Sequence, residues 1–266
     1  DWSSDVCSSD LKIYSKNSIK MNQYSPSGFS MLPPVIKNLL IINIICFVVS
    51  WLAQAYFGLD VANELGLHYI SSPSFKPVQL VTYMFLHANF EHIFFNMFAL
   101  WMFGNTLENF WGGKRFLIYY FVCGLGAGIV QMLVAYIQLH TYAIDDQMWS
   151  TILSEGDELI RTSRNYVDGT LGNVNAIVNA PTVGASGAIF GLLMAFGMLF
   201  PNVEMYIMFI PIPIKAKWLV LGYGLIELFS GLRNAVGDNT AHFAHLGGMI
   251  FGYFLIKYWR KHGSSL

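Results

Sequence analysis

Long runs of apolar residues alternate with short polar stretches along the chain. A helix needs about 20 predominantly apolar residues to cross the hydrocarbon core of a membrane, and several of these runs approach or exceed that length. We therefore predict an all-α integral membrane protein with six transmembrane helices. Their approximate bounds are 38–56, 92–107, 116–139, 184–200, 218–232 and 241–256.

Composition supports a chain that partners with the lipid bilayer. Of 266 residues, 55% are apolar and 12% are charged, whereas a soluble domain carries about 25% charged residues. A water-soluble domain is therefore excluded. The net charge of −1 offers no basic surface for nucleic acid, so we expect no nucleic-acid partner.

The organisation we predict is one membrane domain over residues 21–266 with a long outer loop at about 138–183. Residues 1–20 begin with a Ser/Asp-rich stretch unlike the rest, and we expect them to be non-native or disordered. Cys46 and Cys123 lie inside apolar runs. The cysteines therefore predict no disulfide framework.

Basic residues gather on one side of the predicted topology. Cytoplasmic flanks of membrane helices carry an excess of Lys and Arg, which predicts that both termini are cytoplasmic. Eleven of the fifteen basic residues lie on that side: Lys12, Lys16, Lys20, Lys37, Lys114, Arg115, Lys215, Lys217, Lys257, Arg260 and Lys261.

Polar residues that are costly in a bilayer collect at the opposite, outer ends of three segments. His87 and His92 flank the start of the second segment, Ser186 opens the fourth, and His242 and His245 open the sixth. Ionisable residues at such positions usually face a bundle interior or a wet cavity. These segment ends are the candidate functional site.

Ser186 and His245 form a candidate nucleophile and general base. A serine hydroxyl becomes a nucleophile when a base lies within hydrogen-bond reach, and histidine is the commonest base. Their helices must approach closely, which small residues allow. Two glycine stripes fit that need: Gly187 with Gly191, and Gly248 with Gly252.

Candidate oxyanion donors lie beside them. Helix N-termini present unpaired N–H groups, so the backbone N–H of Ser186 is one donor. His92 and Asn96 are four residues apart and project to one side of their helix. The acidic residue nearest to His245 in sequence is Asp238, in a loop, and we predict a Ser-His dyad without a carboxylate.

At these residues the chain resembles the rhomboid family of intramembrane serine proteases, over about residues 35–258. Three stretches carry the resemblance: HANFEHIFFNM at 87–97, GASGA at 184–188 and HFAHLGG at 242–248. The resemblance implies that Ser186 is the nucleophile and that His245, rather than His242, is the base. It also implies that His92, Asn96 and the Ser186 N–H form the oxyanion hole, with Gly184 in the nucleophile motif.

The resemblance further implies a six-helix bundle whose water-filled cavity opens to the outer side, with single membrane helices as substrates. Two positions depart from the family pattern. Val78-Gln79 stands where a Trp-Arg pair is often found, so the anchoring of the first outer loop is expected to differ. Phe190 replaces a tyrosine that stacks on the catalytic histidine; its ring can still stack but lacks the hydroxyl.

The predicted function is an intramembrane serine endopeptidase of the bacterial plasma membrane that needs no metal or organic cofactor. The oligomeric state is not predicted. The rival from another class is a catalytically silent rhomboid-like protein that binds membrane helices. A transporter with a histidine-lined path is disfavoured because the polar cluster stops near Asn96.

Other polar groups have simpler interpretations. The four histidines of the outer ends could bind zinc, a minor alternative. Glu108 is expected to pair with Lys114 or Arg115. Glu227 is expected to be solvated at the membrane interface, and the acidic outer loop to be a solvated loop.

Overall fold

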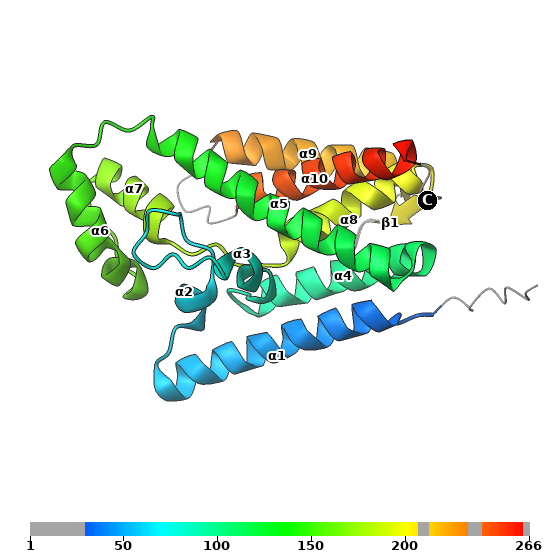
Figure 1. Ribbon diagram of the computed structural model, residues 1–266, viewed down its shortest axis with the longest axis horizontal. Helices are drawn as coiled ribbons and strands as arrows, with labels where there is room; N and C mark the ends of the chain where they lie inside the picture. The colour runs from blue at the N-terminus through cyan, green and yellow to red at the C-terminus, as the bar shows by residue number, and fades with distance from the viewer. Residues whose placement is uncertain (1–29, 207–212, 234–240, 263–266) are drawn as a thin grey trace, which may run out of the picture. The chain divides into compact units, whose positions relative to one another are not determined.

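A computed structural model describes residues 30–206, 213–233 and 241–262 of the chain (Figure 1). The described residues from Met31 onward belong to one compact unit. The segment predicted to be non-native or disordered, residues 1–20, lies outside the described residues, as does Asp238.

Each of the six predicted segments coincides with a helix. Their bounds are α1 Pro34–Phe57, α4 Phe90–Trp111, α5 Gly113–Leu139, α8 Ser186–Leu199, α9 Ala216–Arg233 and α10 His242–Lys261. The connections contain shorter elements, which are α2 Val61–Leu65, α3 Gln79–Thr82, the 3-10 helix η1 Tyr83–Phe85, α6 Asp146–Arg161, α7 Gly169–Asn179, and the antiparallel pair β1 Glu204–Tyr206 and β2 Pro213–Lys215.

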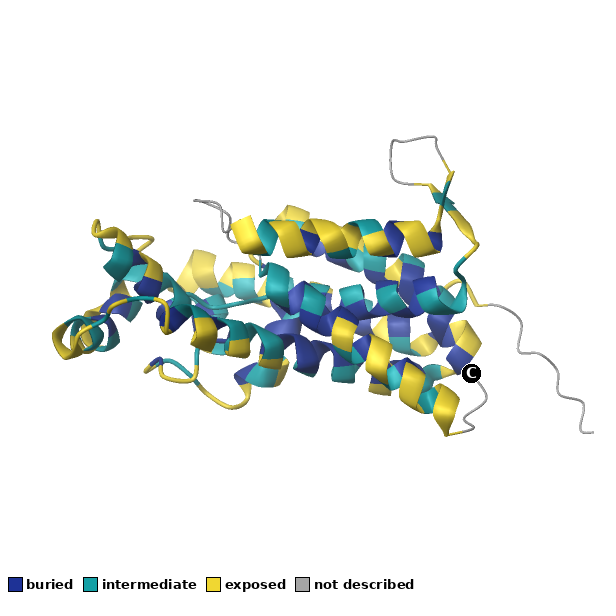
Figure 2. Cartoon of the chain, turned by 90° about the horizontal axis from the view of Figure 1, so that it is seen from above, coloured by how far each residue is buried: buried dark blue, intermediate teal, exposed yellow. Residues whose placement is uncertain are grey.

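Helix α8 is the centre of the bundle. It packs against α4, α5, α9 and α10, while α5 and α10 also pack against each other and α1 lies against α4. Figure 2 shows buried residues along the middle of this bundle and exposed ones on its outer faces. The first residue of α8, Ser186, is thereby placed where several helices meet.

Among the described residues, two helices are both long and apolar enough to cross a membrane, α1 and α5; α8 is apolar but shorter. The all-α architecture is therefore confirmed, while the six-span bundle stays a prediction. Helices α4, α9 and α10 also carry ionisable side chains, such as Glu91, Glu227 and Lys257. Their apolar side chains are nevertheless widely exposed, for example Phe94, Phe229 and Phe254.

Glu108 holds the N-terminus of α1 against α4. The buried carboxylate accepts hydrogen bonds from the backbone N–H of Val35 at 3.0 Å and of Ile36 at 2.8 Å. The first N–H groups of a helix lack helical partners, and negative charge is favourable there. The sequence predicted only that Glu108 pairs with Lys114 or Arg115. It did not predict these bonds to the start of α1, because that segment lies some 70 residues away in sequence.

We expect Glu108→Gln to destabilise the fold. It weakens two hydrogen bonds to a charged acceptor, and such bonds contribute about 1.5–3 kcal/mol each. Thermal unfolding in detergent micelles should show a clearly lowered midpoint. Glu155→Gln on an exposed position of α6 is the matched control, and equal midpoints for the two variants would contradict the assignment.

The long outer loop is built around two helices with a small core of their own. Trp149, Ile152 and Leu153 recur at helical spacing in α6, and this face packs on Val174 and Val178 of α7. A Cβ on Gly156 would collide with the side-chain amide of Asn175, so glycine leaves room for this contact between the two helices. The expectation of a solvated loop was wrong in this respect, because α6 is amphipathic.

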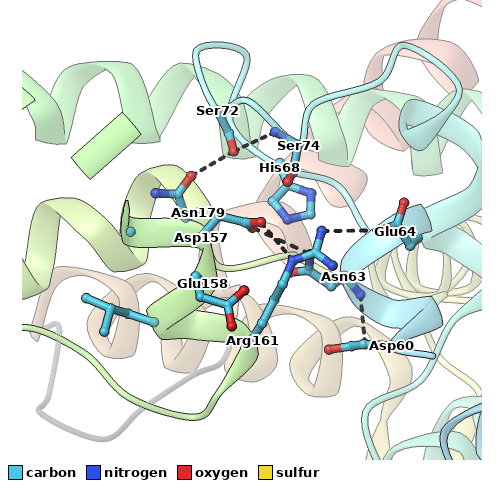
Figure 3. A network of polar contacts seen from close by, with 12 residues as sticks. Asp60, Asn63, Glu64, His68, Ser72, Ser74, Asp157, Glu158, Arg161 and Asn179 are labelled. Carbon is cyan, nitrogen blue, oxygen red and sulfur yellow. Dashed lines mark hydrogen bonds and ion pairs between the residues drawn. The ribbon is translucent and has the colours of Figure 1, made fainter. Parts of the chain in front are cut away.

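Polar contacts join these helices to the first outer loop (Figure 3). Arg161 forms ion pairs with Asp157 at 2.7 Å and with Glu64 at 3.2 Å, and Glu64 also pairs with Lys76 at 2.7 Å. Ser72 donates to Asn179 at 2.8 Å. Residues of α2, α6 and α7 are thus fastened together outside the bundle.

Gln79 anchors the first outer loop through a network of hydrogen bonds. Its side chain is fully buried and uses both ends. The amide oxygen accepts from the N–H of His68 and Lys76, and the amide nitrogen donates to the carbonyls of Glu64 and Ser74, at 2.9–3.3 Å. One buried amide therefore joins four backbone groups of this loop, while a difference in anchoring from the family stays a prediction.

We expect the part of the chain formed by the first outer loop, α6 and α7 to become less stable on acidification. Burial lowers the pKa of His68, so the folded chain leaves it neutral while the unfolded chain binds a proton below the ordinary pKa of about 6.5. Lys76 and Arg161 lower the pKa of Glu64, whose contribution is lost only at more acidic pH. Stability should therefore fall as the pH drops below about 6.5.

Hydrogen exchange of residues 59–85 and 146–180, corrected for its intrinsic pH dependence, measures this effect. His68→Asn should flatten the dependence near pH 6.5. An unchanged pH dependence in that variant would show that another group is responsible.

Candidate active site

Ser186 and His245 lie in direct contact. The Oγ of Ser186 is 2.7 Å from the Nε2 of His245, and the histidine is buried. Ser186 begins α8 and His245 lies one turn into α10. The structure therefore brings the predicted nucleophile and base within hydrogen-bond distance, as proton transfer between them requires.

Glycines allow this approach. A Cβ on Gly248 would overlap the carbonyl oxygen of Gly187, so the backbones of α8 and α10 touch here. A Cβ on Gly191 would collide with Cys123 and come within 3.1 Å of the Gly248 carbonyl oxygen. Gly252, predicted to belong to the same contact, instead makes room for the Tyr119 hydroxyl of α5, which donates to the Gly191 carbonyl at 2.8 Å. Three helices rather than two are therefore locked together below the site.

The ring of His245 is clamped on one face by Phe190. Their centroids are 4.3 Å apart and their planes are 8° from parallel. Phe190 lies one turn after Ser186 on the same helix, so the nucleophile's own helix also fixes the plane of the base. The predicted stacking by a phenyl ring is confirmed.

His92 lies against the segment that precedes Ser186. Gly184 has a φ of +132°, which favours glycine, and a Cβ there would be 2.8 Å from the Nε2 of His92 and 3.5 Å from the Oγ of Ser186. The Nδ1 of His92 faces the N–H of Ala88 at 3.4 Å. Accepting that N–H leaves the ring proton on Nε2, facing the nucleophile side.

Asn96 is buried one turn below His92 and donates to the His92 carbonyl at 2.8 Å. Its amide nitrogen has a second N–H for another acceptor. The N–H of His92 is itself capped by Asn89 at 2.8 Å. The start of α4 is therefore well fixed beside Ser186, while the role of Asn96 in an oxyanion hole stays a prediction.

A carboxylate that the sequence analysis did not place at the site lies behind the histidines. The Oε2 of Glu227, on α9, is 2.7 Å from the Nδ1 of His242 in a hydrogen bond. The same oxygen is 2.9 Å from the Nδ1 of His245, at ion-pair distance though not aligned as a hydrogen bond. Glu227 is buried, which corrects the expectation that it is solvated. The signal that could have found it is the cost of a lone carboxylate in an apolar segment.

The four histidines do not form one cluster. Among the described residues, the group of ligating atoms that lie close together consists of Glu227, His242 and His245. His87 and His92 contact each other instead, with ring centroids 5.1 Å apart. The alternative of a four-histidine zinc site is therefore not supported.

We expect Gly248→Ala to disrupt the dyad geometry. The new methyl group must push against the Gly187 backbone, and overpacking of this kind costs about 1–3 kcal/mol or more. Thermal unfolding in detergent should show the loss. Gly222→Ala on α9, where a Cβ meets nothing within 4 Å, is the control, and a Gly248→Ala protein as stable as this control would contradict the close backbone contact.

Comparison with known proteins identifies the family. Residues 74–262, well over half of the chain, match the rhomboid domain, and the chain belongs to the rhomboid family. It is 25% identical over 252 residues to Rhomboid protein 1, mitochondrial, of Saccharomyces cerevisiae, a match that covers 88% of this chain and 59% of the yeast protein.

Two further relatives come from other organisms. The human Presenilin-associated rhomboid-like protein, mitochondrial, is 24% identical over 208 residues, covering 72% of this chain and 41% of its own length. Rhomboid-like protein 11, chloroplastic, of Arabidopsis thaliana is 26% identical over 226 residues, covering 77% and 60%. The chain thus spans about half the length of these relatives. Their names are organellar, so the expectation of a bacterial plasma membrane has no support from them.

Proposed function

We propose that this chain is an intramembrane serine endopeptidase that cleaves single-span membrane substrates near the outer leaflet of the membrane. The observation that carries the proposal is the 2.7 Å contact between Ser186 Oγ and His245 Nε2. Membership of the rhomboid family, whose members are in general intramembrane serine proteases, supports it.

The proposed setting is a bundle of six membrane helices. Helices α1 and α5 have the length and hydropathy of membrane spans, and only Ile36, Leu39 and Asn43 of α1 are buried. An apolar helix with so much exposed surface is stable in lipid rather than in water. The excess of Lys and Arg on the flanks opposite Ser186 favours an orientation with both termini on the cytoplasmic side.

The chemistry we propose is acyl transfer. Ser186 Oγ attacks the substrate carbonyl carbon while His245 Nε2 accepts the hydroxyl proton. The oxyanion is stabilised by the N–H of Ser186, which as the first residue of α8 lacks a helical partner, by His92 Nε2–H and by Asn96. His245 then donates the proton to the leaving amine. Water, deprotonated by His245, hydrolyses the acyl-enzyme and frees Ser186.

The chain's own residues perform every step of this scheme, and we propose no metal or organic cofactor. Oligomeric state plays no part in it, because the nucleophile, the base and the oxyanion donors all come from one chain. Substrate selection would rest on local unwinding, since an amide within a helix is shielded and already hydrogen-bonded. Helix-breaking residues near the outer end of a substrate should therefore promote cleavage.

The test is cleavage of a tagged single-span reporter with helix-breaking residues near its outer end. Wild type should release the predicted fragment, and Ser186→Ala and His245→Ala should each lose activity by at least about 10³-fold, as removal of a nucleophile or base does in serine proteases. Ser150→Ala on the exposed surface of α6 should match wild type.

Cleavage that persists in purified Ser186→Ala protein would overturn the mechanism. Absence of cleavage in every variant, together with absence of labelling by a fluorophosphonate, would instead favour the silent helix-binding protein. Ser186-dependent labelling without cleavage would indicate an enzyme offered the wrong reporter.

A further inference from the structure

Three ionisable side chains form a buried cluster behind the nucleophile. Glu227 of α9 places one oxygen 2.7 Å from His242 Nδ1 and 2.9 Å from His245 Nδ1. All three are buried or partly buried. An unpaired carboxylate is costly in such surroundings. The position of Glu227 against both histidines therefore indicates that it has a function at the site.

Resting on the proposed function, we propose that Glu227 is a positioning residue for the general base, held in place by His242. The site then works as a Ser186-His245-Glu227 triad rather than as a dyad. Glu227 does not touch substrate or the reacting atoms. It acts through the imidazole of His245.

The geometry shows what Glu227 contributes. The Nε2 of His245 must present a lone pair to Ser186, so its proton must sit on Nδ1. A carboxylate oxygen 2.9 Å from Nδ1 favours that tautomer. When Nε2 takes the serine proton, the ring becomes an imidazolium, and the same carboxylate lies beside the new positive charge.

Phe190 and Glu227 restrain different motions of the ring. The parallel stack with Phe190 opposes rotation of the ring about its Cβ–Cγ bond but does not hold the ring against sliding within its own plane. The carboxylate at the Nδ1 edge opposes that displacement. The contact is not yet aligned as a hydrogen bond, and in free enzymes catalytic hydrogen bonds are often poorly aligned and tighten in the reacting complex.

His242 holds the carboxylate where His245 needs it. It lies one turn before His245 on α10 and forms the aligned 2.7 Å hydrogen bond to Glu227. Glu227 itself comes from α9, so the base on α10 depends on correct packing of a third helix.

The same three side chains offer two imidazoles and a carboxylate, a set that also suits zinc. The distances favour the positioning role. Zinc binds each ligand at about 2.0–2.2 Å in tetrahedral geometry, which would hold the ligand atoms apart, whereas one Glu227 oxygen already lies 2.7 Å and 2.9 Å from the two histidine nitrogens. A metal requirement is an outcome that the experiment can detect.

The test compares Glu227→Gln and Glu227→Leu with wild type on the reporter substrate. Gln keeps the shape and one acceptor oxygen but loses the charge, and Leu loses both. General-base catalysis contributes about 10²–10⁴-fold. We therefore expect kcat to fall at least about tenfold for Gln and about 100-fold or more for Leu, with KM nearly unchanged. Glu91→Gln, at an exposed position of α4, should behave as wild type.

His242→Asn provides a second route, because it leaves Glu227 in place without its partner. We expect a smaller fall in kcat, again without a change in KM. Thermal unfolding identifies any variant that fails to fold. If a Glu227 variant fails, His242→Asn and the rate of fluorophosphonate labelling, which needs no bound substrate, decide the question.

Several results would overturn the inference. Wild-type kcat in folded Glu227→Leu, or a change confined to KM, would show that Glu227 does not act on the base. Loss of wild-type activity in EDTA with recovery in zinc would show a metal site instead. These results leave Ser186-dependent labelling intact. Failure of the proposed function would abolish labelling in wild type itself, and the inference would fall with it.

Discussion

The close backbone contact between α8 and α10 is the constraint on which the rest of the site depends. A Cβ at Gly248 would overlap the Gly187 carbonyl, so only glycine lets the two helices meet here. The contact sits directly beneath Ser186 and His245, which lie one residue before Gly187 and three before Gly248. Because helices are stiff, this spacing fixes the 2.7 Å contact between nucleophile and base more firmly than either side chain could.

Two buried carboxylates, Glu108 and Glu227, each have partners that compensate their charge, but their roles differ. Glu108 accepts two backbone N–H groups at the start of α1, and Glu227 lies between two histidines. Each is placed where its charge is compensated, as burial demands. Glu108 secures one helix to the bundle, whereas Glu227 lies beside the candidate general base.

Sequence reasoning located the helices and the reacting pair, because apolar runs and polar residues inside them are local signals. It paired Ser186 with His245 from their positions at helix ends and from the glycine stripes between their helices, whereas the stacking of Phe190 on His245 was implied by the family resemblance. It missed the partners of Glu108, which lie some 70 residues away in sequence. It also missed the pairing of Glu227 with His242 and His245, which depends on how the neighbouring helices α9 and α10 pack together. It also missed the fold of the outer loop, where the amphipathic spacing of Trp149, Ile152 and Leu153 was available but its packing partner α7 was not evident. It did not foresee the four hydrogen bonds by which Gln79 helps to anchor the neighbouring loop.

The measurement that tests the central claim most directly is the location of a fluorophosphonate adduct by peptide mass spectrometry in wild type and in His245→Ala. The account predicts that wild type carries the adduct on Ser186 and that the adduct is absent, or formed at least about 10²-fold more slowly, without the base. An adduct on another residue, or equal labelling of Ser186 in both proteins, would contradict a serine activated by His245.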